Sequence, residues 1–228
     1  MKVGSLFSGV GGFDLGLERA GMRVVWQVEN DAYCRKVLAK HWPDVTRYKE
    51  VADVGFANLE AVDCIAGGFP CGDLSHVGRR AGIEGESSGL WTEFARIIGE
   101  LRPDYALVEN VPSLLVRGMG RILGDLAAIG YDAEWDCIPA AALGAPHLRA
   151  RIFVLAYASG RRYGTPDETI FAGRAVTEFH GRWQTKPDLG RVAHGVPNRV
   201  DRLRALGNAI VPQVAEWVGK RIIGQEKG

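Results

Sequence analysis

A lone thiol in a glycine-rich segment is the feature of this sequence that most suggests chemistry. Cys71 follows Gly67-Gly68-Phe69-Pro70 and precedes Gly72. The apolar run 61–66 predicts a short buried strand, and the two glycines after it predict a sharp turn. Cys71 would then lie at the carboxyl end of a strand, where open α/β sheets bind their ligands. A thiolate there is a nucleophile, whereas most single cysteines are small buried hydrophobic residues, so the neighbours of Cys71 decide between the two interpretations.

Acidic residues follow other predicted strands. Glu29 comes directly after the apolar strand 23–28, and Asp53 follows another interval of strand length. Glu29 would bind ribose hydroxyls and Asp53 an adenine amino group. Glu109 ends the strand 105–108 and would face the same crevice as Cys71, unless it is a helix-capping or surface acid.

The N-terminal segment resembles a nucleotide cradle in its pattern. Residues 3–17 run from an apolar strand through a glycine loop into a helix with apolar positions at helical spacing. Gly9, Gly11 and Gly12 do not follow the G-x-G-x-x-G dinucleotide fingerprint. The loop alone is therefore a weak indication of a nucleotide cofactor.

Five segments in order resemble the motifs of the DNA cytosine-C5 methyltransferase family. They lie at residues 7–13, 68–71, 109–111, 149–153 and 204–212. The resemblance implies an α/β, Rossmann-like class I S-adenosylmethionine-dependent methyltransferase fold. It also implies an enzyme that transfers a methyl group from S-adenosylmethionine to carbon 5 of cytosine in double-stranded DNA, leaving S-adenosylhomocysteine.

The same resemblance assigns the catalytic roles. Cys71 would add to carbon 6 of a cytosine flipped out of the duplex, which makes carbon 5 nucleophilic. Glu109 would hydrogen-bond ring nitrogen N3 and the exocyclic amine, and Arg151 would hold the O2 oxygen. Arg149 would bind nearby backbone or support the loop. The base that removes the carbon-5 proton is not identified.

The resemblance also assigns a set of cofactor-binding residues spread from the first loop to the last motif. They are Phe7, Ser8, Gly9, Gly11, Gly12, Glu29, Asn30, Asp53, Val54, Pro70, Leu90, Asn208 and Ala209. Because the last of these must reach the pocket from the far end of the chain, a helix over residues 211–223 should pack back on the N-terminal half.

Three departures from the family pattern stand out. Gly72 and His147 occupy positions where the family usually has glutamine. The interval 158–199 is short for a target-recognition domain, as in compact phage and prophage members. We therefore expect a methyltransferase domain over residues 1–157 and 200–228 and a much reduced recognition lobe over 158–199, reading a site of roughly two to four base pairs.

Composition is consistent with a single enzyme that binds DNA. The chain has 228 residues, of which 46% are hydrophobic, enough for a full core. The formal net charge of +1 divides into −6 for residues 1–140 and +7 for residues 141–228, and the basic half would face phosphate. The four cysteines include no C-x-x-C pair, so no metal and no disulfide are expected. The sequence shows no signal peptide and no membrane span, and a reducing cytoplasm suits the proposed thiolate. A monomer is the default expectation.

Other interpretations remain at this level. The same chemistry on RNA is the nearest, and a catalytically silent protein that binds DNA or cofactor is another. A nicotinamide oxidoreductase is disfavoured because Cys71 and Glu109 would then have no purpose. Protection of phage or host DNA from a restriction enzyme is a plausible role, with no partner enzyme identified by the sequence.

Overall fold

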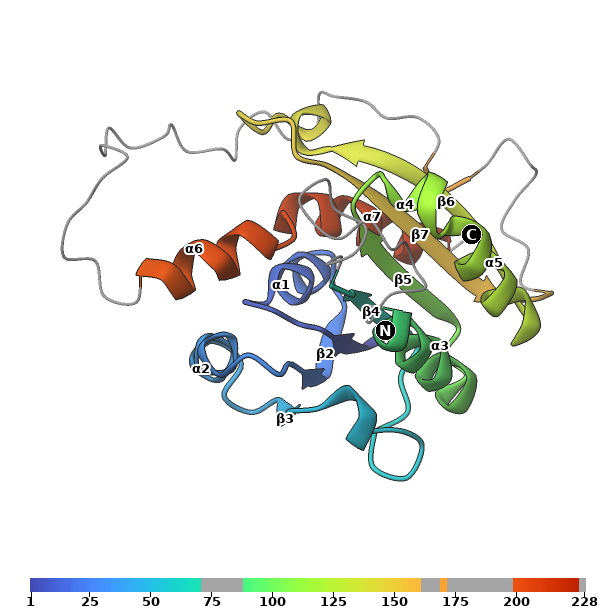
Figure 1. Cartoon of the computed structure of the whole chain (residues 1–228), viewed down its shortest axis with the longest axis horizontal. Helices are drawn as coiled ribbons and strands as arrows, with labels where there is room; N and C mark the ends of the chain where they lie inside the picture. Colours follow the sequence, from blue (N-terminus) through green and yellow to red (C-terminus); the bar gives the residue numbers. More distant parts are fainter. Residues whose placement is uncertain (71–87, 161–168, 172–198, 226–228) are drawn as a thin grey trace.

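The computed structural model describes residues 1–70, 88–160, 169–171 and 199–225, which form an α/β fold around one sheet (Figure 1). The described strands are β1 (Lys2–Leu6), β2 (Arg23–Val28), β3 (Thr46–Tyr48), β4 (Cys64–Gly68), β5 (Tyr105–Asn110), β6 (Tyr131–Pro139) and β7 (Ala150–Ala158). Their order is β3-β2-β1-β4-β5-β7-β6. β1 to β5 pair in parallel, and β7 and β6 add antiparallel strands at one edge. The predicted α/β class is confirmed.

Helices cover both faces of the sheet. The described helices are α1 (Gly12–Arg19), α2 (Ala32–His41), the 3-10 turn η1 (Val51–Asp53), α3 (Ser88–Leu101), α4 (Leu114–Arg117), α5 (Met119–Ala128), η3 (Ala140–Leu143), α6 (Arg199–Asn208) and α7 (Pro212–Gln225). Successive strand residues point to opposite faces, so Leu107 packs with α1 and α7 while Val108 packs with α3 and α5. The parallel strands are therefore buried on both sides, as their apolar runs indicate.

The C-terminal helix packs on the first helix, as the sequence predicts. The helix expected over residues 211–223 is α7, and its Trp217 and Val218 are buried with Leu17 of α1. The two helices approach very closely at Gly16. A Cβ atom there would lie 2.3 Å from the Pro212 carbonyl oxygen and 2.5 Å from the Ala215 Cβ atom. The two ends of the chain thus share one core.

The strand predictions hold for most of the sheet, with one correction. β1, β2 and β5 lie where the apolar runs predict them. The strand expected over 61–66 is β4, which runs on through Gly67 and Gly68. The prediction that these glycines turn the chain is wrong. They instead allow close packing, since a Cβ atom on Gly67 would lie 2.4 Å from the Leu6 carbonyl oxygen.

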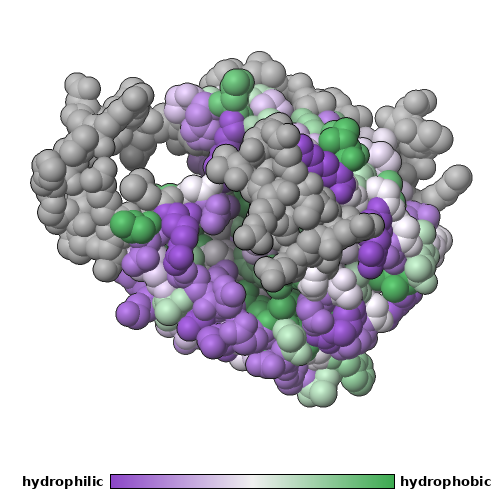
Figure 2. All heavy atoms as spheres, viewed as in Figure 1, coloured by the Kyte–Doolittle hydropathy of each residue, from purple (hydrophilic) through white to green (hydrophobic). Residues whose placement is uncertain are grey.

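The proposed division into a main domain and a small lobe stays a prediction, because most of 158–199 lies outside the described residues. Ile170 and Phe171 are buried in the same core cluster as α1 and α7. In the view of Figure 2, the surface over α2 and β3 is mainly hydrophilic, and hydrophobic residues appear in smaller patches. Among the helices of the described segments, none is long and apolar enough to cross a bilayer.

Candidate active site

A cavity of about 630 Å³ opens at the carboxyl ends of β1, β2, β4 and β5. This is the edge of a parallel sheet where ligands bind in folds of this kind. Many predicted site residues line it, namely Phe7, Ser8, Gly9, Gly12, Glu29, Asn30, Pro70, Leu90, Glu109, Arg151, Asn208 and Ala209. The size is within the range of pockets that hold cofactor-sized molecules.

Glu29 organises the loop that follows β1. Its two carboxylate oxygens accept hydrogen bonds from the backbone N–H groups of Gly9, at 2.8 Å, and Asp31, at 2.7 Å. A carboxylate oxygen has a second lone pair, so Glu29 can hold the loop and still accept bonds from a ligand's hydroxyl groups. Asp31 in turn caps α2, where its side chain accepts bonds from the N–H groups of Tyr33 and Cys34.

The last motif closes the cavity from the far end of the chain. A Cβ atom on Gly12 would lie 2.4 Å from the Ile210 carbonyl oxygen, so the missing side chain lets this segment approach the loop. Arg149 donates hydrogen bonds to the carbonyl oxygens of Gly207, at 2.9 Å, and Ala209, at 2.6 Å. Arg149 therefore binds the backbone of the last motif, and its assignment to the catalytic set stays a prediction. It does not line the cavity but borders a neighbouring hollow.

Glu109 is a deeply buried acid of the cavity, with only 7% of its surface exposed. Its Oε1 atom lies 3.0 Å from Nε of Arg151 on the neighbouring strand β7. Burial raises the pKa of the Glu109 carboxyl to about 7, and the cations of Arg151 and Arg149 oppose this rise only in part. Gly68 makes room for the group, because a Cβ atom there would lie 2.5 Å from the Glu109 Oε2 atom.

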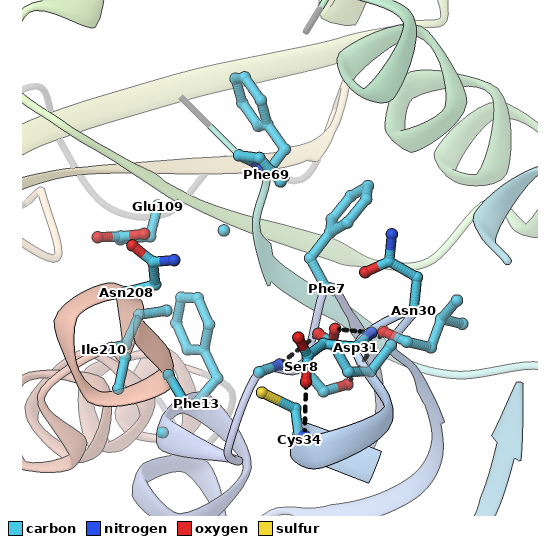
Figure 3. A pocket seen from close by; sticks show the side chains of 18 of the residues that line it. Phe7, Ser8, Phe13, Asn30, Asp31, Cys34, Phe69, Glu109, Asn208 and Ile210 are labelled. Atoms are coloured by element: carbon cyan, nitrogen blue, oxygen red, sulfur yellow. Dashed lines mark hydrogen bonds between the residues drawn. The ribbon is translucent and has the colours of Figure 1, made fainter. Parts of the chain in front are cut away.

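Figure 3 shows how these groups face one another across the cavity. The side chains of Glu109 and Asn208 lie on one side, and those of Ser8, Asp31 and Cys34 lie on the other. Phe69 stands beside this space at the end of β4. Polar side chains therefore line the cavity on two sides, and the aromatic ring of Phe69 adds apolar surface beside them.

Asn110 fixes the chain just before the expected nucleophile. Its buried side chain donates a hydrogen bond to the Phe69 carbonyl oxygen at 3.2 Å and accepts one from the Val111 N–H group at 2.8 Å. Cys71 itself lies outside the described residues, so its role stays a prediction. Asn110 holds the backbone at Phe69, which lies two residues before Cys71 in the sequence.

Three other predicted cofactor residues do not line the cavity. Asp53 is exposed in the 3-10 turn η1, whereas Val51 at the start of this turn does line it. Val54 is buried in the core beside α3. Gly11 caps α1 with a positive φ of 85° and faces Trp42 on the other side of the loop.

The comparisons with known proteins agree with this geometry. A family model described as C-5 cytosine-specific DNA methylase matches residues 1–196. The chain belongs to this family. The Type II methyltransferase M2.BsuMI of Bacillus subtilis is 34% identical over 215 residues, covering 91% of this chain and 50% of its own length. The Type II methyltransferase M.Eco47II of Escherichia coli is 36% identical, covering 66% of this chain and 38% of its own.

A solved structure supports the methyltransferase fold. It is that of a putative DNA modification methyltransferase encoded within an Escherichia coli prophage, with a TM-score of 0.59 and 30% identity. The match covers 69% of this chain and 47% of that one. The Rossmann-like methyltransferase fold is thus confirmed. The chain spans half or less of the length of the curated relatives named here.

Several cavity residues of this C-5 cytosine-specific DNA methylase family member were missed from the sequence. They are Phe13, Val28, Asp31, Cys34, Lys49, Glu50, Val51, Gly68, Phe69, Val111, Arg204, Ala205 and Ile210. Most are neighbours of predicted ones, so adjacency to a motif was the available signal. Arg204 opens the last motif, but nothing in the motif indicates its partner. It pairs with Asp31, far away in sequence, and joins α6 to α2 beside the cavity.

Within the described segments, no group of three or more His, Cys, Asp or Glu side chains is arranged to hold a metal ion. The cavity instead offers what a nucleoside with a charged tail needs. Gly9 and Gly12 leave backbone accessible, Glu29 presents a carboxylate, and Leu90 and Pro70 add apolar surface. These residues fit S-adenosylmethionine, the cofactor of the family.

Proposed function

We propose that this protein methylates carbon 5 of cytosine in double-stranded DNA, with S-adenosylmethionine bound in the cavity. Family membership supports the reaction class. The observation that supports the proposal most is the buried Glu109 carboxyl, with a pKa of about 7, in contact with Arg151 at the cavity. The proposal includes a monomer that acts in the cytoplasm and protects DNA from a restriction enzyme.

The chemistry explains why such a carboxyl is needed. Cys71, as thiolate, would form a bond to carbon 6 of cytosine, and the displaced electron pair would make carbon 5 nucleophilic. That addition places negative charge on the ring. A carboxyl group with a pKa near 7 is partly protonated at neutral pH, so Glu109 can donate a hydrogen bond or proton to N3. When bound, S-adenosylmethionine supplies the methyl group that carbon 5 attacks.

Arg151 would bind both the target base and the Glu109 carboxyl group. Its guanidinium contacts Glu109 at 3.0 Å and also lines the cavity, so it can hold the O2 oxygen of the same base. A base then removes the carbon-5 proton, and the sulfur of Cys71 leaves carbon 6 with its bonding pair. The target must leave the duplex for this reaction, at a cost of a few kcal/mol.

Base-resolution cytosine methylation mapping tests the proposal. The chain is expressed in a bacterial host free of cytosine methylation, beside Cys71→Ser and Glu109→Gln variants. We expect methylcytosine at one short sequence with the unchanged chain, none with Cys71→Ser, and a strongly reduced level with Glu109→Gln. Unmethylated DNA from all three strains, with methylated RNA from the first, would refute the DNA assignment.

A further inference from the structure

Arg96 of α3 is a charged residue outside the cavity that makes an unusually complete set of contacts. Its guanidinium donates to Glu93 at 2.6 and 2.8 Å and to Glu100 at 2.8 Å. It also donates to two backbone carbonyl oxygens, those of Val51, at 3.2 Å, and Val54, at 2.8 Å. The carbonyl contacts reach more than forty positions back along the chain.

Arg96 holds a segment that reaches the cavity at one residue, Val51. Val51 lines the cavity and packs against the same core cluster as Leu90, which also lines it. Val54 is buried in that cluster. The partner Glu100 binds the same segment once more, since it accepts a hydrogen bond from the Phe56 N–H group at 3.0 Å.

We propose that Arg96 is a positioning residue that fixes the adenine-facing wall of the cofactor cavity by holding the carbonyl groups of Val51 and Val54 against α3. This inference rests on the proposed use of S-adenosylmethionine. The flat faces of adenine are apolar, so the apolar side chains of Val51, Pro70 and Leu90 suit them better than the polar side chains of Ser8 and Asn208.

An arginine is required by this geometry. Its planar group presents five N–H donors in fixed directions, and Arg96 uses them on two carboxylates and two carbonyls at once. Lysine has a single ammonium group and cannot span the same set. Loss of the donors frees the carbonyls of residues 51 and 54, and the wall then loses its fixed distance from α3.

Binding of S-adenosylhomocysteine to the whole protein, measured by titration calorimetry, tests the inference. For Arg96→Met we expect the dissociation constant to rise about tenfold, and for Arg96→Lys about threefold. The matched control is Arg121→Met, which removes an ion pair of similar geometry with Asp125 on α5. It should bind within about twofold of the unchanged protein.

Two further readouts separate positioning from general damage. KM for S-adenosylmethionine should rise with kcat nearly unchanged. The affinity for methylthioadenosine, which lacks the amino-acid end, should fall by the same factor as that for S-adenosylhomocysteine. If Arg96→Met fails to fold, as a thermal melt would show, Arg96→Lys supplies the comparison.

Folded Arg96 variants that bind S-adenosylhomocysteine like the unchanged protein would overturn the inference. A loss confined to S-adenosylhomocysteine, with methylthioadenosine unaffected, would overturn it too. If the unchanged protein binds neither ligand, the proposed function fails first, and the role of Arg96 falls with it.

Discussion

Asp14 gives the sharpest test of the electrostatics beneath the first loop. Its carboxyl is fully buried in α1 and accepts hydrogen bonds from Ser5 Oγ at 3.0 Å and Gln27 Nε2 at 2.7 Å. Burial raises its pKa from 3.8 to about 6, and the two hydrogen bonds oppose that rise only in part. The folded state therefore favours the protonated form of Asp14.

The sign of the pH effect follows from this raised pKa. The folded protein binds the proton more tightly than the unfolded chain, so the stabilisation is complete below pH 3.8 and is lost as the pH rises through about 6. The whole difference corresponds to roughly 3 kcal/mol. Between about pH 4.5 and 7.5 the loss is about 2 kcal/mol.

Asp14→Asn should remove this part of the pH dependence, because the amide has the same shape and carries no charge. The assay is urea unfolding of the variant and the unchanged protein at a series of pH values. Over this interval the unchanged protein should lose about 2 kcal/mol of unfolding free energy that the variant does not lose. The difference between the two proteins should therefore shift by about 2 kcal/mol in favour of the variant. Asp132→Asn, on an exposed position of β6, is the control. Parallel stability curves for the Asp14 variant and the unchanged protein would refute the reasoning.

Three more predictions follow from the packing and charges. The pKa of Glu109 is raised to about 7, so the unchanged protein should lose up to about 3 kcal/mol of unfolding free energy as the pH rises from 4.5 through 7. Glu109→Gln should not show this loss. Parallel urea unfolding curves for the two proteins would contradict the prediction. Gly16→Ala should lower the free energy of unfolding by about 1–3 kcal/mol, because the added methyl group overpacks against α7. Gly124→Ala has open space around it in α5 and should raise that free energy by about 0.5–1 kcal/mol. Equal effects of the two substitutions on thermal melting would rule out the close contact at Gly16. A double-mutant cycle on Asp31 and Arg204 should give a coupling energy below about 1 kcal/mol, since the Arg204 side chain is 61% exposed; a coupling of several kcal/mol would show that solvent does not screen the pair.

The sequence predicted the parts of the fold that depend on local patterns. Apolar runs located β1, β2 and β5. The acid that follows β2, Glu29, and the acid near the end of β5, Glu109, both line the cavity. β3 was missed because it has only three residues. β6 was missed although its polar and apolar residues partly alternate, as in an edge strand with one exposed face.

The site was less predictable where side-chain direction matters. Asp53 was expected at the cavity, but in the 3-10 turn it is Val51 that lines the cavity while Asp53 is exposed. No periodicity rule gives the direction of a side chain in such a short turn. The contacts of Arg204 with Asp31 and of Arg96 with Val51 join distant segments. A single sequence carries no signal for such pairings.

The packing of α7 on α1 also bears on how the protein is made. During translation, the residues of the first loop and Glu109 leave the ribosome long before Asn208 and Ile210, which complete the cavity. Until α7 docks, Phe13 and Leu17 of α1 present apolar surface without their final partners. A nascent or prematurely terminated chain would therefore lack a finished cofactor cavity and would expose a target for chaperones and proteases. The cavity would therefore be complete only after residues 208–210 have been made and have packed against the first loop.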